Sequence, residues 1–138
     1  MPPSPWISAM RKEQPIKAGR FTRTYQAYEI FLLKKMAITH QTLGTSATTV
    51  YTSSGNTTVT AMFFMNNNAS ARTLDLYVVP NGGTAGTTNQ IVKSLTIDPA
   101  DTYVINIEKI ILSNGDFIAA TSSDDATSIY ATVSYVSI

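Results

Sequence analysis

The chain has 138 residues, a length typical of a single domain, and its formal net charge is +1. It contains no cysteine, which excludes a disulfide framework and any thiolate metal site. Residues 1–36 carry seven Lys or Arg against two Glu, a net charge of +5, whereas residues 37–138 carry three Lys or Arg against seven acids, a net charge of −4. We therefore divide the chain into a basic arm, residues 1–36, and a domain, residues 37–138.

The arm contains four prolines among its first 15 residues, which exclude a long helix there. Its basic residues, Arg20 and Arg23 among them, predict contact with a neighbouring subunit or an acidic surface. Nucleic acid is the least expected partner, because the arm lacks well-spaced aromatic residues between its charges. Two other interpretations stay open: a tail without fixed structure, and a gene start placed upstream of a natural start at Met36.

The arm has no pattern of a membrane-associated or exported segment. Its longest apolar run, residues 30–33, is far shorter than the roughly 20 residues that a membrane span needs. The proline-rich start does not resemble a secretory signal. We therefore expect no contact with a membrane.

The domain shows the two-residue periodicity of β-strands from Ala37 onward. Alternating apolar positions predict strands over residues 58–65, 73–78, 102–107 and 128–135, and shorter ones over residues 48–52, 91–97, 110–112 and 117–120. Turn clusters rich in Asn and Gly separate them, and no segment has the pattern of a crossover helix. We therefore predict an all-β fold, an antiparallel β-sandwich or jelly roll of about eight strands.

Residues that carry catalytic chemistry are sparse. His40 is the only histidine, and we interpret it as a surface or interface residue rather than a general base. One histidine without cysteine cannot build a zinc site unless three carboxylates join it. One calcium hypothesis stays open, in which Asp116 and the pair Asp124-Asp125 supply oxygen ligands from neighbouring loops. We predict a protein that is not an enzyme and has no cofactor.

The domain contains several tyrosines that suit either core packing or surface contact: Tyr51, Tyr77, Tyr103, Tyr130 and Tyr135. Aromatic rings gathered on an exposed sheet face would form a platform for stacking on sugars, although packing within the protein is commoner. Tyr77 and Tyr130 fall on the side of their strands opposite the predicted core, so they are the predicted surface contacts. The alternative function is therefore a carbohydrate-binding module that recognises glycan on a host surface.

Three stretches of the domain resemble small virion proteins of tailed bacteriophages, especially marine and cyanobacterial phages. They read TTVTAMFFMNN at residues 57–67, LDLYVVPNGG at residues 74–83 and IEKIILSNGDFIAA at residues 107–120, and ATVSY at residues 131–135 is similar to the ending of such proteins. The resemblance covers residues 36–138. It implies a small β-sandwich in the virion that decorates or cements the capsid, or sits in the tail or baseplate, and it implies no catalytic residue.

The resemblance also implies the partners of the chain. They are other virion proteins of the capsid or tail and further copies of the same chain. Exposed edge strands in a domain of about 100 residues favour closure by neighbouring subunits. We therefore expect a homo-oligomer, with a trimer first.

Overall fold

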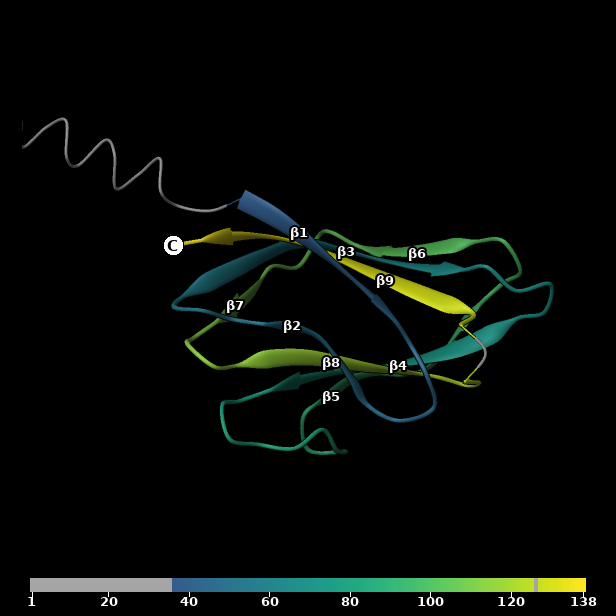
Figure 1. Ribbon diagram of the computed structural model, residues 1–138, viewed down its shortest axis with the longest axis horizontal. Coiled ribbons are helices and arrows are strands. Elements are labelled where there is room, and N and C mark those ends of the chain that lie inside the picture. Colours follow the sequence, from purple (N-terminus) through teal and green to yellow (C-terminus); the bar gives the residue numbers. More distant parts are fainter. Residues whose placement is uncertain (1–35, 126) are drawn as a thin grey trace, which may run out of the picture. The chain divides into compact units, whose positions relative to one another are not determined.

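The computed structural model describes residues 36–125 and 127–138, and every regular element in them is a β-strand (Figure 1). The strands form two antiparallel sheets, seen as an upper and a lower layer in Figure 1. Sheet A has the order β1 (Met36–Thr42), β9 (Ile129–Ser137), β3 (Thr57–Asn66) and β6 (Thr102–Ile105), and β7 (Ile110–Leu112) also pairs with β3. Sheet B has the order β2 (Thr48–Thr52), β8 (Phe117–Ser122), β4 (Arg72–Val79) and β5 (Gln90–Ile97).

The predicted all-β fold of antiparallel sheets is confirmed, and each of the eight predicted strands is present. The prediction missed β1, because its sequence Met-Ala-Ile-Thr-His-Gln-Thr places apolar and polar residues on both of its faces. This strand forms through regular pairing with β9, from Met36 opposite Val136 to Thr42 opposite Tyr130. That the strands are connected in the order of a jelly roll stays a prediction. Residues 1–35 of the predicted arm, with Arg20 and Arg23, lie outside the described residues, whereas Met36 is the first residue of β1.

The core lies between the sheets, because alternate side chains of each strand point inward. The largest fully buried apolar side chains of this core are Phe64, Leu43, Met62, Leu74, Leu76, Leu112, Ile118, Ile129 and Val133. Full burial of one such side chain contributes about 1.5–3 kcal/mol. Packing of this single core therefore holds the two sheets together without a disulfide.

Two aromatic side chains connect the sheets near the β1–β2 side. The rings of Tyr51 in β2 and Tyr135 in β9 stack with their centroids 4.2 Å apart. The Tyr51 hydroxyl lies 3.1 Å from the Thr57 hydroxyl, so its polar end has a partner as well. On the same side Leu43, in the β1–β2 connection, is only 1 % exposed. These contacts explain why both tyrosines face the protein rather than solvent.

The outer face of sheet B is partly covered by the connection between β4 and β5, residues 80–89. Val79 and Ala119 lie on this outer side and are nevertheless buried. Gly83, Thr84 and Ala85 of this connection line one shallow hollow together with Thr49, Phe117 and Ala119, so the connection lies against β2 and β8 on this side. Sheet A has no comparable cover among the described residues, and the two outer faces therefore differ.

Candidate functional site

The outer face of sheet A is the candidate site. Residues opposite one another in antiparallel strands point to the same side of a sheet. Pairing therefore places His40, Thr132, Phe63 and Val104 in one row across β1, β9, β3 and β6. By the same rule this face consists of Met36, Ile38, His40, Thr42, Thr58, Ala61, Phe63, Met65, Thr102, Val104, Ile111, Tyr130, Thr132, Ser134 and Val136.

The chemistry of this face is apolar and hydroxyl-rich. None of the residues just named is Asp, Glu, Lys or Arg. The large apolar side chains with the greatest exposure on it are Met36 (77 %), Ile111 (71 %) and Ile38 (61 %). Phe63 and Met65, in the middle of the sheet, are also about two-fifths exposed. Large exposed apolar patches on a protein surface mark sites of interaction.

The outer face of sheet B has a different character. Asp75 of β4 lies on it and accepts a hydrogen bond from the Ser94 amide at 2.6 Å. Lys93 is exposed on β5, at the edge of the same sheet. The charged side chains and the covering connection leave sheet B less suited than sheet A to close apolar contact with another protein.

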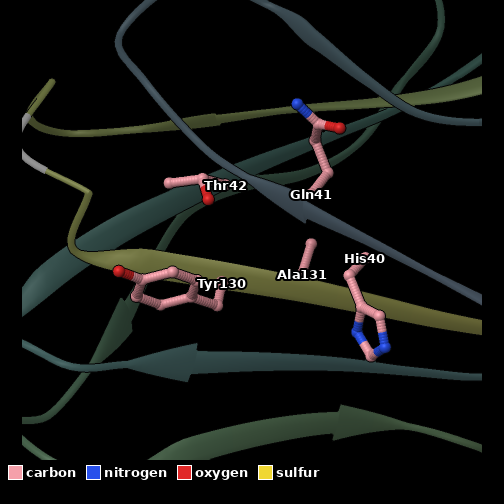
Figure 2. A pocket seen from close by; sticks show the side chains of 5 residues that line it. All are labelled: His40, Gln41, Thr42, Tyr130 and Ala131. Carbon is pink, nitrogen blue, oxygen red and sulfur yellow. The ribbon is translucent and has the colours of Figure 1, made fainter.

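A depression of about 360 Å³ lies on the β1–β9 side of sheet A (Figure 2). His40 is exposed there, and its Nδ1 lies 3.0 Å from the Thr132 hydroxyl. Figure 2 shows Gln41 pointing away from His40 and Tyr130, to the other side of β1. Among the described residues, no carboxylate lines the depression, so none of them gives His40 an acidic partner there. The described residues of this lining therefore contain no pair of acid and base side chains that converge on one point.

The two tyrosines predicted as surface contacts lie on different sheets. Tyr130 is on the outer face of sheet A and is 37 % exposed. Tyr77 pairs with Ala119 on the outer face of sheet B, where it is half-buried. They therefore do not form one stacking platform for a sugar.

The three acids of the calcium hypothesis lie in separate contacts. Asp116 accepts hydrogen bonds from the amides of Asn81 and Ser113, at 2.9 and 2.8 Å. Asp124 forms an ion pair with Arg72. Asp116 precedes β8 and Asp124 follows it, so the strand separates them. The described part of the chain contains no group of three or more residues that could hold a metal ion.

Asp125 connects two loops at the same end of the domain. Its Oδ1 accepts hydrogen bonds from both the hydroxyl and the amide of Thr45, each at 2.7 Å. The hydroxyl first, and then the amide, lower the pKa of Asp125 because both stabilise the carboxylate. The contact ties the β1–β2 loop to the β8–β9 loop, and its role is structural.

One feature of the sequence is related to this face, namely the apolar residues on both sides of β3. The strand predicted over residues 58–65 is apolar on both sides near its end, which predicts a central strand of a sheet. The structure confirms that β3 lies between β9 and β6, yet Phe63 and Met65 on its second side remain exposed. The apolar second side of β3 therefore belongs to an exposed face rather than to the core.

Comparison with known proteins adds no family to these observations. The sequence matches no model of a protein family, and no curated protein matches it either. Residues 36–125 and 127–138 contain no helix with the length and apolar character needed to cross a membrane.

Proposed function

We propose that this chain is a non-enzymatic structural protein of a bacteriophage particle, which binds other virion proteins through the outer face of sheet A. Decoration or cementing of the capsid is the first role, and a place in the tail or baseplate is the second. The observation that carries the proposal is the exposed, uncharged face described above. The resemblance of residues 36–138 to small phage virion proteins supports the choice of partner.

A partner that binds this face removes water from its side chains. Burying apolar surface contributes about 25 cal/mol per Å². Burying a charge without a partner costs several kcal/mol, and this face has no Asp, Glu, Lys or Arg. Hydroxyl groups such as Thr132 and Ser134 can form hydrogen bonds across an interface. A protein partner therefore gains from apolar contact with sheet A at little electrostatic cost.

A glycan-binding function has less support from the arrangement of side chains. Sugar recognition of the kind predicted from the sequence needs several aromatic rings on one face. Tyr77 and Tyr130 lie on different sheets, and Tyr51 stacks on Tyr135 instead of facing solvent. Only Tyr130 of these residues remains on the candidate face.

A peptide map of purified phage particles tests the proposed function. Particles of the phage that encodes this chain are washed, digested and quantified by mass spectrometry. We expect peptides of residues 37–138 at a fixed ratio to a major capsid or tail protein, and peptides of residues 1–35 would show whether the arm belongs to the mature chain. A phage replication protein serves as the negative control. If washing removes this chain as completely as it removes the replication protein, the proposal is rejected.

A further inference from the structure

The four outer strands of the two sheets differ in how well they are protected against pairing with another chain. Unprotected edges invite further strands, and proteins protect them with bulges, charges or short length. Within the described residues, β1 and β6 end sheet A, whereas β2 and β5 end sheet B. Three of these edges carry such a device, and β1 does not.

The protective devices are visible in the pairing. The register of β2 with β8 shifts between Thr49 and Tyr51. The register of β5 with β4 shifts twice, Ser94 has a φ of 50°, and Lys93 adds a charge. β6 has only four residues, and β7 on the same side has three. Each of these edges therefore offers only a short or irregular row of backbone groups for pairing with a strand of another chain.

β1 is a regular and uncharged edge. It has seven residues, pairs with β9 without a register shift, and contains no Asp, Glu, Lys or Arg. Its outward side chains include Met36 and Ile38, which are 77 % and 61 % exposed. A regular edge without a bulge or a charge is a ready template for another strand.

We propose that β1 pairs antiparallel with β1 of a second copy about a twofold axis, so that sheet A continues from one subunit into the next. This pairing rests on the proposed function, in which sheet A contacts other proteins. A twofold contact is self-complementary, because residue i of one copy contacts residue j of the other and residue j contacts residue i. β1 contains no Asp, Glu, Lys or Arg, so pairing of two β1 strands brings no like charges of these side chains together.

The pairing would also extend the candidate face. In an antiparallel pair centred on Thr39, Ile38 of each copy lies opposite His40 of the other, and Met36 opposite Thr42. The apolar side chains of both copies then join into one larger face that stays open to other virion proteins. A contact of this symmetry gives a dimer instead of the trimer expected from the sequence.

A cysteine scan of the full-length chain tests the pairing, because the natural sequence contains no cysteine. Ile38→Cys, Thr39→Cys and His40→Cys are made one at a time and mildly oxidised. Residues directly opposite in an antiparallel pair have Cα atoms about 4.5–5.5 Å apart, within the range of a disulfide. We expect one of these variants to be mostly a disulfide-linked dimer. Thr49→Cys, exposed on the β2 edge, is the control and should remain mostly unlinked.

Light scattering on the unmodified chain and on Ile38→Lys provides the second measurement. The unmodified chain should be a dimer, and Ile38→Lys a monomer because it places two like charges in the contact. Thr49→Lys should remain a dimer. The inference would be overturned if the unmodified chain were a monomer or a trimer. It would also be overturned if Thr49→Cys formed as much disulfide-linked dimer as the cysteine variants in β1. A β1-linked dimer that is missing from phage particles would reject the proposed function alone.

Discussion

Replacing Phe64 with alanine should lower the free energy of unfolding by about 3–5 kcal/mol, because the change leaves a large cavity in the core. Phe64 is 0 % exposed and belongs to the apolar cluster shared by both sheets. Urea unfolding, followed by circular dichroism, should show a lower transition midpoint with an unchanged slope.

The neighbouring residue provides a matched control. Phe63 has the same side chain in the same strand, but it points to the outer face of sheet A and is 39 % exposed. Phe63→Ala should cost less than about 1 kcal/mol, because water already reaches that side chain. Equal losses for both variants would mean that the assignment of faces in β3 is wrong.

Replacing Asn66 with aspartate should lower the free energy of unfolding by about 3–5 kcal/mol. Asn66 is fully buried at the end of β3, and its Nδ2 donates hydrogen bonds to the carbonyls of Ser70 and Ile97, at 3.0 and 2.9 Å. Its Oδ1 accepts a hydrogen bond from the Asn68 amide. Aspartate keeps the size and the acceptor, but it loses both donors and buries a negative charge beside carbonyl oxygens.

The same unfolding measurement checks this prediction, with Asn67→Asp as its control. Asn67 is exposed and adjacent, so the same substitution there should change the free energy by less than about 0.5 kcal/mol. The loss at Asn66 should also shrink at acidic pH, because a protonated carboxyl group can again donate one hydrogen bond. A loss at Asn66 no greater than at Asn67 would show that this network does not fix the β3 turn to the end of β5.

Most of the fold was predictable because strands with one buried side have a two-residue period. The alternation of Leu74 and Leu76 with Thr73 and Asp75 defined β4 directly, and clusters such as Asn114-Gly115 marked where strands end. β1 was not predictable in this way. It lies at an edge with one neighbour, so its own side chains carry little of the core pattern, and its pairing with β9 supplies the missing constraint.

The candidate site was less predictable, since a face depends on register between distant strands. Met36, Thr58 and Ile111 lie in one row only because β9 and β3 align them. The sequence identified Tyr130 of this face but could not show that Tyr77 belongs to the other sheet. The sequence also could not show that Asp116 and Asp124 lie apart. The distance between them depends on the course of β8, which Asp116 precedes and Asp124 follows.

Binding to phage particles assembled without this protein tests the central claim, that the outer face of sheet A binds another virion protein. Purified Phe63→Glu is compared with the unmodified chain and with Thr49→Glu, which places the same charge on the edge of sheet B. We expect both variants to fold, Phe63→Glu to bind at least about tenfold more weakly, and Thr49→Glu to bind normally, since tenfold corresponds to about 1.4 kcal/mol. Folded Phe63→Glu that binds as well as the unmodified chain would contradict the claim.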